Sequence, residues 1–277
     1  MIVHLIDGTY ELFRQFYGLQ RIPEAKRRRW DAAVGVLQSI LEMIEQDATH
    51  LGVATDHVIE SFRNALWPGY KTGAGIDPAL FAQFRPLEEG LVAMGVAAWP
   101  MTELEADDAL ASAAKLAAAD PAVQKVCLWT PDKDLAQCVV GDRVVQVDRK
   151  AKAIRDASAV KAKFGVEPAL IADWLALVGD AADGYPGIPG IGRIGAARLL
   201  NQHGPIEAFP PALLGGRLEQ ALLFKRLATL RTDAALFDSV EVLRWNGPTE
   251  RFAAWTELAQ APKLLERSRQ AALKATR

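Results

Sequence analysis

The stretch "GDAADGYPGIPGIGRIGAARLL", residues 179–200, places two aspartates beside a turn rich in glycine and proline and then opens a helix. Gly187, Gly190 and Gly192 are separated by apolar residues, which is typical of a turn where the main chain approaches something bulky. A helix that begins after such a turn directs unpaired N–H groups outward and favours a phosphate there. An ordinary helix connection has the same composition, so the rest of the chain must decide between the two interpretations.

Short apolar runs alternate with helical patterns over the first half of the chain. Strands are indicated at residues 2–6, 50–55, 96–99, 126–130 and 144–147. Helices are indicated at residues 31–46, 78–94 and 105–119, with a short one near residue 133. This alternation predicts an α/β fold in which a parallel sheet is covered by helices on both faces. From about Ser158 the pattern is helical, and Pro168 opens the helix that precedes the quoted loop.

Composition narrows the class of protein. Half of the 277 residues are hydrophobic, enough for a substantial core. The opening "MIVHLIDGTY" has no basic leader and is interrupted by His4 and Asp7, so we expect a buried strand and a cytoplasmic location. Cys127 and Cys138 lack metal-ligand spacing and are expected to be packing residues. The basic run 26–29 is expected to be a solvated loop unless it contacts phosphate.

Carboxylates gather where the predicted strands end and where one helix begins. The residues concerned are Asp7, Asp56, Asp132 and Asp134 after strands, and Glu105, Asp107 and Asp108 at the helix start. A ligand site in an open α/β sheet lies beyond the carboxyl ends of its strands. One acid there could be a simple helix cap, but so many would repel one another unless cations neutralised them. Oxygen ligands without His or Cys suit Mg²⁺ or Mn²⁺, and two such ions about 4 Å apart can hydrolyse a phosphodiester.

Four motifs in order carry a resemblance to a known family. "LIDGTYELFRQFYG", "ELEADDALA", "TPDKDLAQCV" and "GDAADGYPGIPGIG" resemble the acidic motifs of the 5′ nuclease (flap endonuclease) family, which includes the 5′-3′ exonuclease domain of bacterial DNA polymerase I. The likeness runs from residue 1 to about 240. It implies a PIN-like nuclease domain over 1–165, with an arch segment near 63–90. A helical region over 166–277 would follow, with a helix-hairpin-helix (helix-three-turn-helix) at about 170–204.

The resemblance also implies a metal site for two Mg²⁺ or Mn²⁺ ions. Its expected ligands are Asp7, Asp56, Glu105, Asp107, Asp108, Asp132, Asp134, Asp180 and Asp183. The chain has 32 basic and 34 acidic residues, so removing these nine acids leaves 25 acidic against 32 basic, about +7. That balance suits a nucleic-acid partner.

Further roles follow from the resemblance alone. The hairpin, with a possible K⁺ ion, is expected to hold duplex phosphates, and Lys71 to contact the scissile phosphate, so that Lys71 and Asp107 are the expected catalytic residues. The full set of expected DNA contacts is Arg63, Tyr70, Lys71, Gly187, Gly190, Gly192 and Arg193. The chain departs from the family pattern at Ala74, Pro131, Gly184, Arg193 and Ile194.

The expected function is therefore that of a structure-specific 5′-3′ exonuclease and flap endonuclease of DNA replication or repair. It would act as a monomer on DNA with a 5′ flap, fork or end, without contact with a membrane. Two alternatives are a PIN-type ribonuclease, which normally lacks the hairpin, and a DNA-junction-binding protein that does not cleave.

Overall fold

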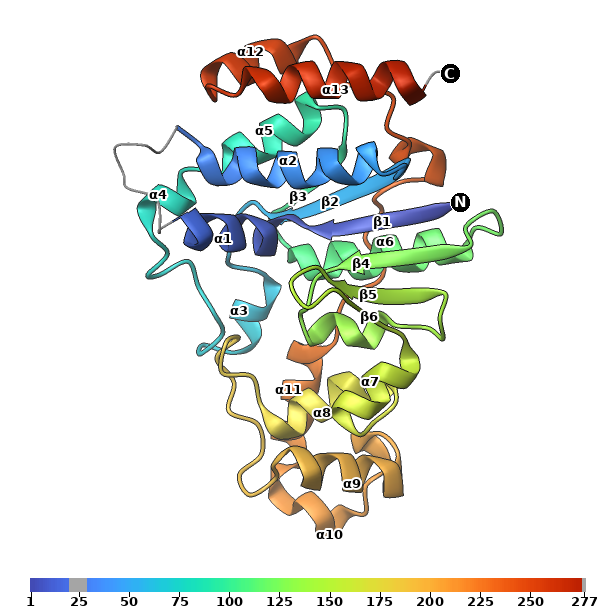
Figure 1. The fold of residues 1–277 in the computed structure, drawn as a ribbon. Helices are drawn as coiled ribbons and strands as arrows, with labels where there is room; N and C mark the ends of the chain where they lie inside the picture. Colours follow the sequence, from blue (N-terminus) through green and yellow to red (C-terminus); the bar gives the residue numbers. More distant parts are fainter. Residues whose placement is uncertain (20–28, 276–277) are drawn as a thin grey trace.

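A six-stranded sheet lies at the centre of the computed structural model, in which residues 1–19 and 29–275 are described (Figure 1). The strand order is β3-β2-β1-β4-β5-β6. Their bounds are Ile2–Asp7 (β1), His50–Asp56 (β2), Ala97–Met101 (β3), Lys125–Trp129 (β4), Val144–Asp148 (β5) and Ala153–Arg155 (β6). The pairings from β3 to β5 are parallel and β6 is antiparallel to β5. The carboxyl ends of β1 to β5 therefore meet at one edge, as expected for the predicted α/β class.

Helices cover both faces of the sheet because side chains alternate along each strand. Ile6 of β1 packs in one apolar cluster with helices α1, α2 and α5. Val3 and Leu5 point the other way and pack with α6. These helices are Gly8–Leu19 (α1), Asp31–Glu45 (α2), Phe84–Ala93 (α5) and Ala106–Ala119 (α6). Both faces are thus buried, which explains why β1 and β2 read as nearly continuous apolar runs.

The remaining helices lie between the strands or follow the sheet. The α-helices are Phe62–Leu66 (α3), Pro78–Phe81 (α4), Ala157–Phe164 (α7), Ile171–Val178 (α8), Arg193–His203 (α9), Pro211–Leu214 (α10), Leu218–Ala228 (α11), Arg251–Leu258 (α12) and Pro262–Ala275 (α13). The 3₁₀ helices are Asp134–Cys138 (η2), Pro168–Leu170 (η3), Ile206–Ala208 (η4), Gly215–Arg217 (η5) and Val240–Leu243 (η6).

All five predicted strands are confirmed with their ends shifted by at most two residues, whereas β6 was not predicted. The single helix predicted over 78–94 is wrong, because the chain forms α4 and α5 with a break at Ala82 and Gln83. Pro86 accounts for the break: it has no N–H to donate to the carbonyl of Ala82, so one continuous helix cannot form there.

A third apolar cluster holds the helices after the sheet together. It joins α7, α8, α9 and α11, and it includes Tyr70 and Tyr185. After α11 the chain returns to the sheet, where Phe252, Trp255 and Leu264 of α12 and α13 pack into the cluster around α2 and α5. Figure 1 shows the result: α12 and α13 lie at one end of the molecule and α9 and α10 at the other. The helical tip after the sheet is therefore the part of the fold that carries the quoted stretch.

Three expectations concern features outside the sheet. Cys127 and Cys138 are both free thiols, and burial raises the pKa of each. Lys26 and two of its neighbours in the basic run lie outside the described residues, while the guanidinium of Arg29 lies 5.0 Å from the ring centroid of Trp30. Among the described helices, none combines the length and apolar character that a membrane crossing requires.

Candidate metal centre and nucleic-acid interface

Acidic side chains stand together at the carboxyl ends of three adjacent strands. Asp7 is the last residue of β1 and Asp56 the last of β2, while Asp132 follows β4. The hydroxyl of Thr130 donates to Asp7 Oδ2 at 3.1 Å and so ties the ends of β1 and β4 together. Burial, with the charges of Asp56 and Asp132, raises the pKa of Asp7 to about 7. These carboxylates are close enough to oppose one another's ionisation.

The start of α6 brings further acids to the same place. The backbone N–H of Ala106 donates to Asp56 Oδ1 at 2.8 Å, which fixes the helix start against the end of β2. Asp107 lies in the first turn of α6, and burial raises its pKa well above the usual range, with further contributions from Asp132 and Asp7. Asp107 therefore belongs electrostatically with the acids at the strand ends, as its predicted role requires.

A second acidic group joins the sheet to the loop of residues 179–187. Carboxylate oxygens of Asp134, Asp180 and Asp183 all lie within 4.8 Å of one another, and all three residues are buried. Asp134 Oδ1 is buried and has no hydrogen-bond donor among the described residues. Burial raises the pKa of Asp134 well above its usual range, and the charges of Asp132 and Asp183 add to this effect.

The chemistry of this second group fits a divalent cation. It offers only carboxylate oxygens, the ligands preferred by hard ions such as Mg²⁺ and Mn²⁺. Asp134 Oδ1 accepts no hydrogen bond from any described residue, and Lys133 Nζ lies 3.6 Å from it. A buried carboxylate oxygen is normally hydrogen-bonded or bound to metal.

Two lysines lie among the acids. Lys71 Nζ is 2.7 Å from Glu105 Oε2 and 3.0 Å from Asp183 Oδ1. Burial lowers the pKa of Lys71, but the charges of Glu105 and Asp183 outweigh it and raise the pKa well above the usual range. Lys133 Nζ forms an ion pair with Asp180 and lies 3.6 Å from Asp134 Oδ1. Sequence reasoning missed Lys133, although its place between two predicted ligands was a signal.

Arg63 and Asp108 are placed differently from the prediction. Arg63 is 1% exposed and Asp108 is 0% exposed. Both Asp108 oxygens accept from the Arg63 guanidinium at 2.7 Å, and each also accepts a backbone N–H, one from Arg231 and one from Glu105. This corrects two expectations: Arg63 is too deeply buried to contact DNA, and Asp108 already has four donors in place of a metal ion.

Tyr70 is also buried, at 4% exposed, which corrects its expected contact with DNA. Its ring packs in the cluster around α8 and α11, and its hydroxyl donates to Glu105 Oε2 at 3.4 Å. Arg63 Nη1 reaches the other oxygen of Glu105 at 2.9 Å. Despite its burial, Glu105 has a pKa below the usual range because of the Lys71 and Arg63 charges. Of the three arch residues expected at DNA, only Lys71 reaches the surface, with 31% of its side chain exposed.

Glycines shape the loop between α8 and α9. Gly184 has φ +83°, and a Cβ there would lie 1.9 Å from the carbonyl oxygen of Gly69. This contact leaves no room for a side chain at residue 184, one of the positions where the chain departs from the family pattern. Gly187 is buried, and a Cβ there would lie 2.4 Å from the backbone N of Gly179. Gly187 therefore closes the loop and does not face DNA, which corrects its predicted role.

The turn before α9 keeps the features expected of a phosphate contact. Gly190 and Gly192 are exposed, and a Cβ at either would meet no atom within 4 Å. No side chain caps α9, which begins at Arg193. The exposed Arg193 lies with its guanidinium carbon 5.6 Å from the Trp174 ring centroid, and its carbonyl accepts from Trp174 Nε1. The uncapped N-terminus of α9, beside an arginine that Trp174 contacts, is well suited to binding an anion.

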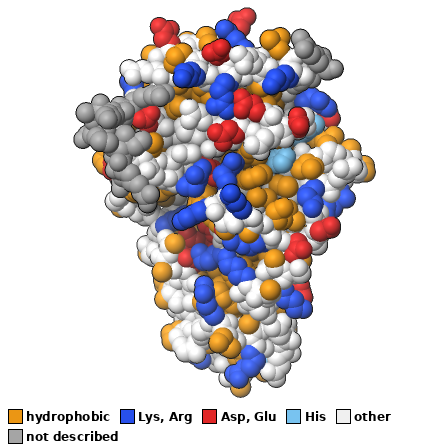
Figure 2. Space-filling model, viewed as in Figure 1, with side chains coloured by type: hydrophobic (Ala, Val, Ile, Leu, Met, Phe, Trp, Pro, Cys, Tyr) orange, Lys and Arg blue, Asp and Glu red, His pale blue; other side chains and the backbone are white. Residues whose placement is uncertain are grey.

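A basic surface lies beside the acidic site. Figure 2 shows Lys and Arg side chains gathered across the middle of one face, next to a recessed patch of acidic side chains, and further down over the helical tip. Burial lowers the pKa of Lys163, and so do the charges of Arg155 and Arg193, which places these three cations near one another. Asp132 is close enough to act on the same lysine. Positive charge therefore runs from α9 to the edge of the acidic cluster.

Comparison with known proteins finds relatives both in sequence and in fold. The chain is 32% identical over 88% of its length to DNA polymerase I of Bacillus subtilis, and 32% identical over 95% to the thermostable DNA polymerase I of Thermus aquaticus. It spans 29% and 32% of those two proteins. In fold it is similar to the T5 D15 protein co-crystallised with metal ions (TM-score 0.70, 17% identity, 97% of this chain and 100% of that one). The catalytic core of Rad2 in complex with DNA substrate is a further neighbour (TM-score 0.58, 12% identity, 97% and 91%).

Two family models match consecutive parts of the chain. Residues 2–165 match the 5′-3′ exonuclease N-terminal resolvase-like domain. Residues 166–251 match the 5′-3′ exonuclease C-terminal SAM fold. The boundary between the models falls after α7, where the chain leaves the sheet for the helices that carry the glycine-rich turn. The chain belongs to the 5′-3′ exonuclease family.

Proposed function

We propose that this protein is a 5′-3′ exonuclease and flap endonuclease that hydrolyses DNA phosphodiesters near a junction of single-stranded and duplex DNA. The observation that carries the proposal is the buried trio Asp134, Asp180 and Asp183, with an Asp134 oxygen that accepts no hydrogen bond from the described part of the chain. Family membership supplies the reaction class. The basic surface beside the acids supports a polyanionic substrate.

We propose two divalent ions, Mg²⁺ or Mn²⁺, shared by two groups of acids. The trio would hold one ion, and the strand-end acids with Asp107 would hold the other. Bound ions would supply Lewis acidity and a nucleophilic water at neutral pH. The protein's own part is to hold the carboxylates in place, and Arg63 does this by fixing Asp108 and Glu105 at the start of α6.

Lys71 is the side chain that we propose to contact the scissile phosphate. Its ammonium bridges Glu105 and Asp183 and is partly exposed, so it lies between the two acid groups at the surface. Its raised pKa keeps it charged at neutral pH. A cation there would stabilise negative charge on the phosphoryl oxygens as the bond breaks.

The turn at Gly190 and Gly192, with Arg193, is proposed to hold the phosphates of the duplex, together with a K⁺ ion. Contacts of this kind position the duplex without reading its sequence. All of these groups come from one chain, so the protein is proposed to act as a monomer. Two free cysteines and a DNA substrate suit the reducing cytoplasm.

A panel of end-labelled substrates tests the proposal: 5′-flapped duplex, nicked duplex, single-stranded DNA and the matching RNAs, each with Mg²⁺. We expect cleavage of the flapped DNA near its junction, and none with EDTA or with the Asp134→Asn variant. Cleavage of RNA alone would favour a PIN-type ribonuclease. Tight binding to the junction without cleavage, at any Mg²⁺ or Mn²⁺ concentration, would favour a junction-binding protein.

A further inference from the structure

A buried tyrosine hydroxyl stands beside the acidic trio without a partner. Tyr185 is 1% exposed, and its ring packs against Phe224 with the ring centroids 5.5 Å apart. The ring is thus anchored in the apolar cluster of α8 and α11. Its hydroxyl has no hydrogen-bond partner among the described residues. Buried phenols normally have one, so this hydroxyl requires an explanation.

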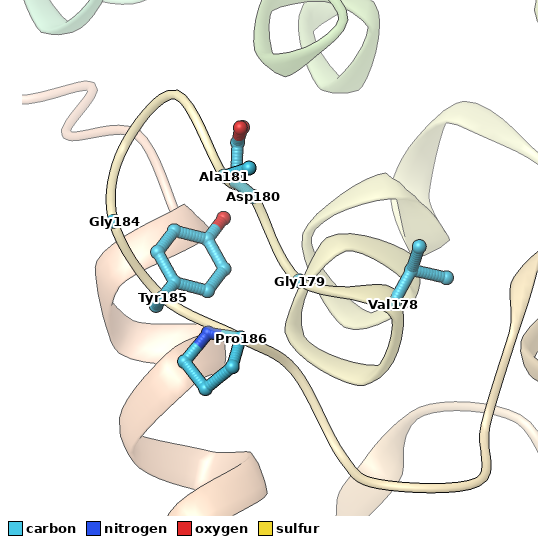
Figure 3. A pocket seen from close by; sticks show the side chains of 7 residues that line it. All are labelled: Val178, Gly179, Asp180, Ala181, Gly184, Tyr185 and Pro186. Atoms are coloured by element: carbon cyan, nitrogen blue, oxygen red, sulfur yellow. The ribbon is translucent and has the colours of Figure 1, made fainter.

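The backbone directs this hydroxyl toward the acids. Asp180 and Tyr185 exchange both of their backbone hydrogen bonds, at 2.8 and 3.0 Å, and form an antiparallel bridge. Residues paired in this way project their side chains from the same face. Figure 3 shows the Tyr185 hydroxyl on the side of the loop where the Asp180 carboxylate lies. Burial raises the pKa of Tyr185, and so do the charges of Asp134, Asp180 and Asp183, so the phenol keeps its proton.

Among the described residues, three buried atoms here have no hydrogen-bond partner: the Tyr185 O–H, Asp134 Oδ1 and Asp180 Oδ2. Asp180 Oδ2 is ion-paired with Lys133, which leaves Asp134 Oδ1 as the acceptor for the phenol. Lys133, the cation nearest to that oxygen, lies 3.6 Å away and forms its ion pair with Asp180. The charge of Asp134 is the first of the three carboxylate charges that act on Tyr185, so the two side chains are near one another, and a ligating carboxylate is usually held by such a neighbour.

We propose that Tyr185 is a positioning residue for the metal centre, whose O–H donates to the Asp134 carboxylate and holds it in its ligating orientation. The inference rests on the proposed metal site at Asp134, Asp180 and Asp183. It makes Tyr185 an indirect part of the centre, because the hydroxyl acts through a ligand and does not touch the substrate.

Tyr185→Phe is the direct test, because it keeps the ring on Phe224 and removes only the oxygen. Mn²⁺ binding is measured without DNA, from the electron paramagnetic resonance signal of the free ion. We expect about tenfold weaker binding, the lower end of the effect of losing such a neighbour. The metal-free melting temperature should stay equal or rise, since an unpaired buried hydroxyl is removed. Tyr17→Phe is the matched control, because Tyr17 is 51% exposed on α1, and both measurements should equal those of the wild type.

A double-mutant cycle with Asp134→Asn separates positioning from packing. If the hydroxyl acts through Asp134, Tyr185→Phe should weaken Mn²⁺ binding much less in the Asp134→Asn background. The double-mutant cycle still tests the role of the hydroxyl if Tyr185→Phe lowers the melting temperature, because it compares the loss of Mn²⁺ affinity in the two backgrounds. If Tyr185→Phe bound Mn²⁺ as tightly as the wild type, or if it lost the same affinity in both backgrounds, the role of Tyr185 would be overturned. The proposed metal site would still stand. If Asp183→Asn and Asp134→Asn bound Mn²⁺ as the wild type does, the proposed metal site itself would fail.

Discussion

Asp107 shows how strongly the site depends on a cation. It lies in the first turn of α6, and burial raises its pKa well above the usual range, with the charges of Asp132 and Asp7 adding to the effect and that of Lys71 opposing it. A carboxylate in such surroundings ionises readily only when positive charge is near. The same surroundings would repel a DNA phosphate.

We expect Asp107→Asn to lower cleavage of flapped DNA by about 100-fold or more while DNA binding stays equal or tightens. The amide keeps the shape of the side chain but removes the charge that holds metal and repels phosphate. Single-turnover cleavage and equilibrium binding measure the two effects. Asp142→Asn, an exposed aspartate in the turn before β5, is the matched control and should behave as the wild type. Unchanged turnover in Asp107→Asn would remove this residue from the centre.

Arg63 is buried and has a structural role, which its substitution can test. Arg63→Met should lower the free energy of unfolding by about 3–5 kcal/mol, because it leaves Asp108 buried without its partner. Urea unfolding measures the loss, and adding Asp108→Leu should recover part of it. Arg226→Met, an exposed arginine on α11, serves as control. A loss for Arg63→Met no larger than that of the control would mean that the ion pair does not hold α6 in place.

At the scale of elements, the segment between α3 and α4 and the start of α9 are the two parts that we propose to position the substrate. The first is fixed at its base, since Asn64 Nδ2 donates to the Lys71 carbonyl and the Lys71 N–H donates to the Asp183 carbonyl. Lys71 is thereby held between the sheet and the loop of residues 179–187. The second is held by Trp174, which contacts Arg193 through both its ring and its N–H.

Lys71→Ala should lower single-turnover cleavage at least tenfold, equivalent to about 1.4 kcal/mol of barrier. The variant removes a charge that lies between the two acid groups. Lys263→Ala on the exposed surface of α13 is the control. If the Lys71→Ala rate stayed within error of the control, Lys71 would be an internal counterion and not a substrate contact.

Arg193→Ala should weaken duplex binding without moving the cut, because a phosphate contact carries no sequence information and the remaining contacts still set the register. The slope of log affinity against log salt should become shallower by about one unit. Arg269→Ala, on α13 at the other end of the molecule, should leave the slope unchanged. A slope for Arg193→Ala equal to that of the wild type would place Arg193 off the interface.

At the scale of the whole molecule, the sequence predicted which strand ends form the site but not which long side chains are buried beside it. Parallel strands bring their ends to one edge, so Asp7, Asp56 and Asp132 could be placed together from order alone. Burial of long side chains could not be foreseen in the same way. Arg63 and Tyr70 were themselves predicted to contact DNA, yet tertiary packing places both inside, against Glu105. The break before α5 followed from Pro86 and was overlooked.

The loop of residues 179–187 illustrates the same limit. Its aspartates were predicted as ligands from the family resemblance, and its glycines were singled out by their type. Gly187 packs on Gly179 at the start of the loop, whereas Gly184 packs on Gly69, which is distant in the sequence, and residue spacing encodes neither contact. The place of the Tyr185 hydroxyl beside the acids depends on how this loop packs against α8 and α11, which no sequence signal indicates.

Single-turnover cleavage of a 5′-flapped DNA, with Mg²⁺ titrated over the wild type and Asp183→Asn, tests the central claim most directly. Our account predicts no cleavage by the wild type in EDTA and a cut near the junction when Mg²⁺ is added. It also predicts that Asp183→Asn needs about tenfold more Mg²⁺ for half-maximal rate, because one carboxylate of the trio is lost. Cleavage in EDTA, or Mg²⁺ curves that coincide for the two proteins, would contradict it.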